Sequence, residues 1–248
     1  MLIYQKNGKL NISFNKKLPP EADIILEKSD KVTLNVGGTI IGGDTPIEPA
    51  VEVKTITALK NALTDPAVTN IKLTSDLSVT SQLKVEKDVT IDLAGHIFDL
   101  SKTSLETPIR VVSGEVTFKN GTVDAASAPD TTVGISAMGG NVILENMNVY
   151  VDTPKESCVY AAYGSKVKVL SGRYENRSSD KYEYGEGAPL VLNIRNDDAG
   201  TIECFGGTFI GRDPALGDDN LGGTFVASGY RSVPTIVDGK QGYIVEAE

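Results

Sequence analysis

Two pairs of neighbouring aspartates are the candidates for acid–base or metal chemistry: Asp197 with Asp198, and Asp218 with Asp219. Adjacent carboxylates can raise one another's pKa or share a cation. Successive residues of a strand point to opposite faces, however, and both pairs lie beside asparagine and glycine residues that favour turns. We therefore interpret both pairs as turn residues, and we expect neither a catalytic residue nor a metal site.

Histidine and nucleotide chemistry are also restricted. His96 is the only histidine, which excludes a multi-histidine metal site, and its place after Ala94-Gly95 favours a structural role in a turn. The sequence contains no Gly-Xaa-Ser-Xaa-Gly motif and no phosphate-binding loop of the Gly-Lys-Ser/Thr type. We expect no cofactor.

Aromatic residues are the main candidates for ligand contact. Five of the nine tyrosines fall within 25 positions, with arginines among them. Tyrosine rings can stack on sugar rings while nearby charged groups hydrogen-bond the sugar hydroxyls. The alternatives are subunit contact and plain core packing, because a chain without Trp has few other large side chains. The candidate residues are Tyr160, Tyr163, Arg173, Tyr174, Arg177, Tyr182 and Tyr184.

Composition limits the partners. The 248 residues include 24 Lys and Arg against 33 Asp and Glu, and the net charge of −9 argues against nucleic acid. The chain is 40% hydrophobic with 25 Gly, which predicts a folded protein, and no apolar run approaches the roughly 20 residues of a membrane helix.

Cys158 and Cys204 are too few and too far apart for a metal motif or a disulfide framework, so we expect buried thiols. Whether the two come close stays open.

Residues 1–42 predict a small β unit. Asn7-Gly8 favours a type I′ turn between two short strands, and further strands are expected at 23–26 and 31–36. Residues 43–52 are rich in Gly and Pro and predict a linker. The apolar hairpin residues are candidates for attachment or oligomerisation: Leu2, Ile3, Tyr4, Leu10, Ile12 and Phe14.

The rest of the chain is periodic. Apolar residues at helical spacing predict one helix at 55–64, and everything after residue 70 reads as short strands. A strand, tight turn, strand pattern recurs five times with spacings of 27, 26, 25 and 35, and a third apolar run precedes each of the last four. Three short strands per coil predict a parallel β-helix over 53–213 and a closing β module over 214–248. The repeats start at Val89, Val116, Val142, Val167 and Ile202.

Particular segments carry a family resemblance. The helix at 55–63, followed by residues 71–77 and 89–96, resembles the start of right-handed pectate-lyase-like β-helix domains. Residues 206–209 and 238–245 resemble the closing module of such repeats in phage virion proteins and bacterial surface proteins. The resemblance implies an all-β fold, a right-handed single-stranded parallel β-helix with its helix as a cap. Relatives that cut polysaccharides use calcium-binding acids with a basic residue, or clustered aspartates, to which the two Asp pairs are only weakly similar.

These observations favour a structural protein of a bacteriophage virion: a head fibre, a capsid decoration protein or a short tail-fibre component. The start of the chain lacks a secretory signal, so we expect synthesis in the host cytoplasm and localisation in the virion. Residues 1–42 would bind other virion proteins, while the β-helix would project as a homotrimer and contact a host surface glycan. Two alternatives stay open: a polysaccharide-degrading lyase or hydrolase of tailspike type, and a bacterial surface adhesin.

Overall fold

The structure is a computed structural model of the chain. It describes residues 49–129, 131–185, 187–195, 199–217 and 223–248, and the backbone of two strands before them. The chain divides into two units, Met1–Glu48 and Pro49–Glu248. In the first unit, β1 (Leu2–Lys6) pairs antiparallel with β2 (Lys9–Ser13), which confirms the predicted hairpin strands. Phe14, the Asn7-Gly8 turn and the strands expected at 23–26 and 31–36 lie outside the described residues.

The described residues of the second unit form mostly strands, with one α-helix, α1 (Ile56–Thr64), and one 3-10 turn, η1 (Pro214–Leu216). Its first strands are β3 (Val51–Val53), β4 (Asn70–Leu73), β5 (Leu77–Ser78), β6 (Leu83–Val85), β7 (Val89–Asp92) and β8 (Ile97–Asp99). The middle strands are β9 (Ile109–Val111), β10 (Glu115–Ala125), β11 (Ile135–Met138), β12 (Asn141–Val151), β13 (Val159–Ala162) and β14 (Lys166–Val169). The last strands are β15 (Gly172–Asn176), β16 (Leu192–Ile194), β17 (Thr201–Cys204), β18 (Gly207–Ile210), β19 (Tyr230–Val237) and β20 (Lys240–Ala247).

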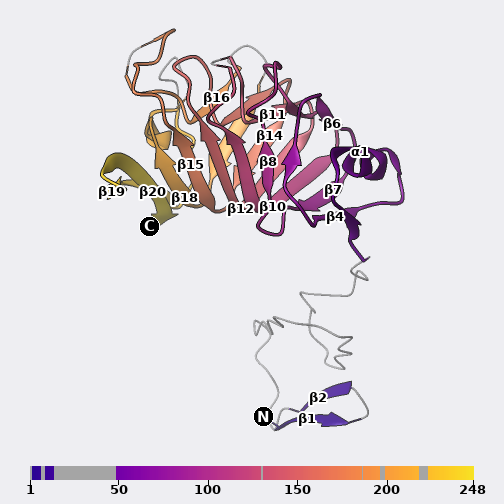
Figure 1. Cartoon of the computed structure of the whole chain (residues 1–248). Helices are drawn as coiled ribbons and strands as arrows, with labels where there is room; N and C mark the ends of the chain where they lie inside the picture. The colour runs from indigo at the N-terminus through magenta and orange to yellow at the C-terminus, as the bar shows by residue number, and fades with distance from the viewer. Residues whose placement is uncertain are drawn as a thin grey trace. The chain divides into compact units, whose positions relative to one another are not determined.

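Successive coils stack in parallel, in the register that the sequence repeat predicts. The starting residues of the five repeats lie side by side, because Val116 pairs with Val89 and Val142, Val142 with Val167, and Val167 with Ile202. Figure 1 shows β4, β7, β10, β12, β15 and β18 as one broad layer. A second, five-stranded sheet runs in the order β16-β13-β11-β9-β6. The expected coil repeat is confirmed, with two sheets enclosing one core.

Left-handed residues let the long strands turn a corner without a loop. Asn120 and Asn146 have φ of 55° and 51°, in the middle of β10 and β12. The Asn146 side chain donates to Asn120 Oδ1 at 3.1 Å, and Asn120 donates to Asp92 Oδ1 at 3.2 Å. The turn expected inside these two repeats is therefore a single residue, stabilised by a ladder of amide hydrogen bonds from coil to coil.

The core follows from the alternation along each strand, which turns every second side chain inward. Each coil supplies apolar residues to shared columns, so Phe98, Val123 and Val149 are followed in register by Tyr174 and Phe209, all fully buried. Both cysteines are buried free thiols, as the sequence predicts, and burial raises their pKa values above the ordinary range.

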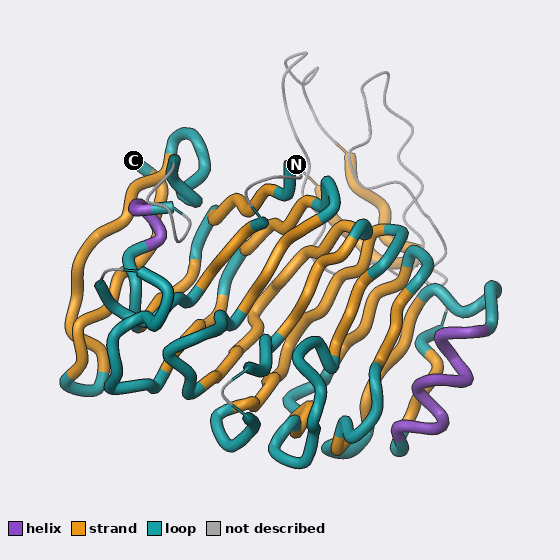
Figure 2. The backbone as a smooth tube through the Cα atoms, turned by 90° about the horizontal axis from the view of Figure 1, so that it is seen from above, coloured by secondary structure: helices purple, strands orange, loops and turns teal. Residues whose placement is uncertain are grey.

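Helix α1 lies at one end of the stack (Figure 2). Thr55 is its N-cap and accepts from Ala58 N at 3.1 Å, while Leu59, Ala62 and Leu63 join the core. Lys87 donates to the carbonyl oxygens of Ala62 and Val68, at 2.9 and 2.6 Å, and so joins the helix end to the next coil. The predicted helix is confirmed.

The linker prediction, by contrast, runs two residues too far. Val51 and Glu52 already belong to β3, where they pair with Ile71 and Lys72 of β4. The β-branched Val51 and the period-2 alternation of this strand outweigh the Gly and Pro content of the segment before it.

The other end of the second unit carries an antiparallel hairpin. Strand β20 pairs with β18 and with β19, which is the last strand of the sheet and contains Pro234. The hairpin turns at Asp238 and Gly239, with φ of 52° and 78°, the backbone that a two-residue type I′ turn requires. Among the described residues, no helix is long and apolar enough to cross a membrane.

Candidate functional site

The fold separates the predicted tyrosines into buried and exposed ones. Tyr174 is fully buried and stacks on Phe209, with ring centroids 5.3 Å apart. Tyr182 is also buried, and its ring contacts Tyr184 edge to face at 5.9 Å. Protein covers both rings, as the core-packing alternative expects for Tyr174 and Tyr182.

The two predicted arginines belong to an ion-pair network around Glu175 in β15. Arg173 Nη2 lies 2.8 Å from Glu175 Oε2, and Arg173 Nη1 lies 2.6 Å from Asp238 Oδ2. Arg177 lies 3.9 Å from the same carboxylate and stacks over the Tyr150 ring at 4.2 Å. Although burial acts to raise it, the pKa of Glu175 is held below its usual value by hydrogen bonds from Lys240 and Arg173. This arrangement serves the structure of the closing hairpin.

Tyr163 differs from the other candidates. It lies in the turn after β13, its side chain is 53% exposed, and its φ of 56° is rare for an aromatic residue. Arg195, in the next coil, donates to the Tyr163 hydroxyl at 3.0 Å, and its guanidinium lies 5.3 Å from the ring centroid. An exposed ring in a strained backbone, fixed by an arginine, is presented to solvent.

The outer face of the five-stranded sheet continues from this turn. Lys84, Arg110, Ser136, Tyr160 and Asn193 form one row across five coils, in register. Arg110 and Tyr160 are partly exposed, whereas Ser136 between them is buried. We name Arg110, Tyr160, Tyr163 and Arg195 the tyrosine–arginine face. It combines aromatic rings with guanidinium donors, the groups that recognise sugars and acidic polymers.

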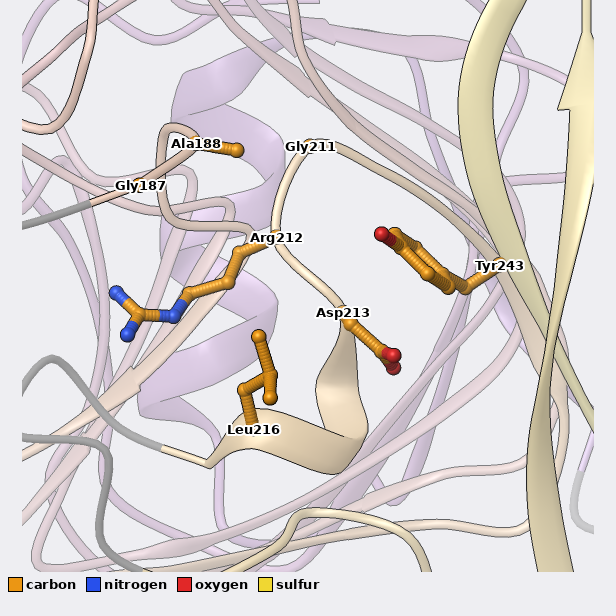
Figure 3. Close-up of a pocket in the computed structure, with 7 residues that line it drawn as sticks. All are labelled: Gly187, Ala188, Gly211, Arg212, Asp213, Leu216 and Tyr243. Atoms are coloured by element: carbon orange, nitrogen blue, oxygen red, sulfur yellow. The ribbon is translucent and has the colours of Figure 1, made fainter.

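A cavity of about 340 Å³ lies at the closing module (Figure 3). Its polar residues are Arg212, Asp213 and Tyr243, and its apolar side includes Leu216. Arg212 is only 6% exposed, and its Nη1 is buried without a hydrogen-bond partner. Burial and the nearby Asp213 carboxylate raise the pKa of Tyr243, so its hydroxyl is a proton donor at neutral pH.

Glu156, in the loop between β12 and β13, has a raised pKa. Burial, together with the charge of Glu106, raises the pKa of Glu156 from 4.5 to about 7. The Thr153 hydroxyl accepts from the Glu156 backbone N–H at 3.3 Å, and Asn176 donates to the Glu156 carbonyl oxygen at 3.3 Å. A carboxyl group with this pKa can give up and take back a proton near neutral pH.

A pectate-lyase-like fold is supported by one comparison with known proteins. The family model described as "Putative pectate lyase-like adhesive domain" matches residues 50–158. The matched segment contains β3, α1 and the coils up to β12. No curated protein and no solved structure matches the chain. Most of the tyrosine–arginine face, and the whole cavity, lie beyond the matched residues.

The remaining candidates do not form a site in the described part of the chain. Asp197, Asp198, Asp218 and Asp219 lie outside the described residues. His96 lies at a corner, with Nδ1 3.2 Å from Asp76 Oδ1, next to the left-handed turn at Ala94 and Gly95. Within the described residues, no three His, Cys, Asp or Glu side chains gather as metal ligands.

Sequence reasoning missed Arg195, Arg212, Tyr243 and the pair Glu106 and Glu156. Each of these residues acquires its environment from coils or strands distant in the sequence, so no local motif identifies it. One signal was available for the buried tyrosine, because Tyr174 occupies the repeat position held by Val149 and Phe209 in the neighbouring coils.

Proposed function

We propose that this chain is an adhesive, non-catalytic β-helix module that binds glycan through the tyrosine–arginine face. The observation that carries the proposal is Tyr163, which is exposed, strained and held by Arg195. The family match, whose description names an adhesive domain, supports the same class of function.

The backbone conformation of Tyr163 costs folding free energy. A left-handed backbone costs an ordinary L-residue about 1–2 kcal/mol, and glycine would avoid that cost at this turn. The ring is more than half exposed, so packing does not offset the cost. Strained residues that the surrounding structure maintains are concentrated at binding sites. A sugar stacking on the ring, with Arg195 donating to its hydroxyl or carboxylate groups, gives this geometry a use.

The stacked coils suit binding to a polymer. Neighbouring parallel strands lie about 4.8 Å apart, so Arg110 and Tyr160 are held two coil spacings from each other on a rigid sheet. Weak contacts to successive units of one glycan chain add up when their spacing is fixed in advance. The proposal also includes two features that the sequence predicts: the right-handed winding of the coils, and the role of α1 as the cap of the stack.

The setting of the module is a separate part of the proposal. The sequence favours a phage particle, with residues 1–42 as the attachment unit and the copies arranged as a trimer; no homologue supports that setting. Mass spectrometry of gradient-purified particles from the native source tests it. Stoichiometric presence of the chain supports a virion role, and its presence only in a cell-surface fraction supports a bacterial adhesin.

The binding proposal is tested on immobilised polysaccharides with wild-type protein and two variants. Tyr163→Ala removes the ring and is expected to weaken binding about tenfold, because stacking of one ring on a ligand contributes on the order of 1 kcal/mol or more. Ile236→Ala is the control, since Ile236 is 66% exposed in β19 of the closing hairpin and does not belong to the tyrosine–arginine face. Equal binding by all three proteins would exclude the tyrosine–arginine face.

Polysaccharide hydrolysis is a second candidate, because Glu156 has a pKa near 7 with a second carboxylate close to it. Glycoside hydrolysis uses such a pair, one as acid and one as base or nucleophile. We expect no loss of polymer length on incubation with the wild-type protein. Depolymerisation that disappears in Glu156→Gln would replace the adhesive proposal with an enzymatic one.

A further inference from the structure

The closing hairpin carries apolar side chains on the outer face of the broad sheet. Phe209 points into the core, so its neighbour Thr208 points outward. Ile244 of β20 pairs with Thr208, and Val233 of β19 pairs with Ile244, so both lie on the same outer face. Figure 1 shows this hairpin beside β18, at the end of the layer. Ile244 is 38% exposed and Val233 is partly exposed, so another molecule can bury this apolar strip.

The outward residues of β20 have a pattern of charge and size. At every second position they are Lys240, Gly242, Ile244 and Glu246. The row has a cation at one end and an anion at the other, and these two side chains are 50% and 47% exposed. Between them lie a glycine and a bulky apolar residue. Positions at equal distances from the middle of the row are therefore opposites, in charge at its ends and in size at its centre.

The surface at Gly242 is apolar, although glycine has no side chain. A Cβ at this position would lie 3.3 Å from Ile210 Cγ1 and 3.4 Å from Val237 Cγ2. The side chains of Ile210 and Val237 therefore flank Gly242. An aliphatic side chain placed over Gly242 would contact carbon atoms rather than polar groups.

We infer that two copies of this chain pair through the outer face of the closing hairpin, about a two-fold axis that crosses the middle of β19 and β20. Half a turn about this axis reverses the strands, so Glu246 of each copy faces Lys240 of the other. The same operation places Ile244 over Gly242 of the second copy. A two-fold interface must be complementary to itself, and this row is, in both charge and size. Packed sheet faces lie about 10 Å apart, a gap that a lysine and a glutamate side chain can span together.

The size of the strip sets the strength of the contact. Strands of eight residues are about 27 Å long, and two of them with their side chains are about 10 Å wide. This is smaller than the roughly 800 Å² per partner of a stable interface, so we expect a dissociation constant between about 10 μM and 1 mM. The tyrosine–arginine face belongs to the five-stranded sheet and stays free in the pair. The inference does not depend on the function proposed for that face.

Sedimentation equilibrium of the full chain, from low micromolar to millimolar concentration, tests the inference. The mass is expected to double, giving a dimer from a monomer or a hexamer from the trimer proposed above, and added salt is expected to weaken the association. Ile244→Arg is expected to weaken it at least about tenfold, because the new charge comes close to Lys240 of the second copy. Ile236→Arg is the matched control, because Ile236 is 66% exposed and pairs with Gln241 on the opposite face of the same hairpin.

A charge exchange tests the two-fold arrangement itself. Glu246→Lys and Lys240→Glu each place like charges opposite one another, so each variant alone is expected to associate severalfold more weakly. A mixture of the two variants restores opposite charges at both ends and is expected to associate as the wild type does. A mass that never doubles, a doubling that Ile244→Arg leaves unchanged, or a mixture no better than its components would overturn the inference. Lys240 also binds Glu175, so circular dichroism establishes that each variant is folded. The comparison of Ile244→Arg with Ile236→Arg decides the matter should Lys240→Glu fail to fold.

Discussion

Glu175 Oε1 in β15 lies 2.8 Å from Nζ of Lys240 in β20, although 65 positions separate the two residues. The other oxygen of the same carboxylate accepts from Arg173, which also binds Asp238 in the hairpin turn. Glu175 is almost completely buried, so it is the central anion of a network that fastens the closing hairpin to the last coils.

Glu175→Gln is expected to lower the free energy of unfolding by about 1.5–3 kcal/mol, the contribution of hydrogen bonds to a charged group. Urea denaturation measures it. Glu246→Gln is the control, because its pair with Arg231 is exposed and should contribute less than about 1 kcal/mol. The pKa of Glu175 is lowered in the folded state, so its stabilisation is complete above the ordinary value of 4.5 and is lost as the pH falls through the lowered pKa. A gap between wild type and Glu175→Gln that persists in strong acid would contradict this role.

The contribution of Glu156 to folding stability is expected to have the opposite pH dependence. Its folded pKa of about 7 lies above the ordinary 4.5, so the folded protein binds a proton that the unfolded chain releases between these values. Stability is therefore expected to fall as the pH rises from about 4.5 to about 7. Glu156→Gln should be more stable than wild type above pH 7 and equal to it near pH 4.5. Thermal unfolding across this range measures the difference, and Glu106→Gln should recover only the part of the effect that comes from its charge.

The buried tyrosine gives a prediction that separates packing from binding. Tyr174→Ala is expected to cost about 3–5 kcal/mol, because it leaves a cavity against Phe209 in the core. Tyr184→Ala should change stability by less than about 0.5 kcal/mol, because its side chain is 67% exposed. Similar denaturation midpoints for the two variants would show that Tyr174 is not a core residue.

Gly172 is expected to tolerate no side chain. Its φ is 120°, and a Cβ there would overlap the backbone carbonyl of Met147 in the neighbouring coil. Gly172→Ala should therefore cost at least about 3 kcal/mol, through strain and through loss of the β12–β15 pairing. Gly164→Ala is the control, since Gly164 also has a positive φ but open space around its Cβ position. Its cost should stay near 1 kcal/mol by the same denaturation measurement.

The coil register was predictable because it depends on a repeated local pattern. Val89, Val116 and Val142 occupy the same place in successive repeats, and the hydrogen-bonded pairing of their strands follows that spacing. Helix α1 was predictable for the same reason, from apolar residues three and four positions apart. Such elements are specified within one repeat.

The candidate site was less predictable, because side-chain environment depends on which coil lies next to which. Tyr163 and Tyr174 are equally aromatic in the sequence, but one lies in an exposed turn and the other in an inward position. Arg173 and Arg177 are candidate ligand donors in the sequence, but the hairpin brings Asp238 to Arg173 and Lys240 to the Glu175 carboxylate that both arginines contact. The cavity of Arg212 and Tyr243 requires an antiparallel return of the chain that no repeat encodes.

Pro234 gives the sheet a fixed end. Pro234 lies in β19, the last strand of this sheet in the described residues. A further strand could pair with β19 only through a row of free backbone N–H and C=O groups. A proline contributes no N–H to that row, so it hinders the addition of another strand at this edge. Copies of the protein are thereby discouraged from joining through this edge into fibrils. The length of the β-helix then depends on the number of coils that the gene encodes, and it is the same in every copy of the protein.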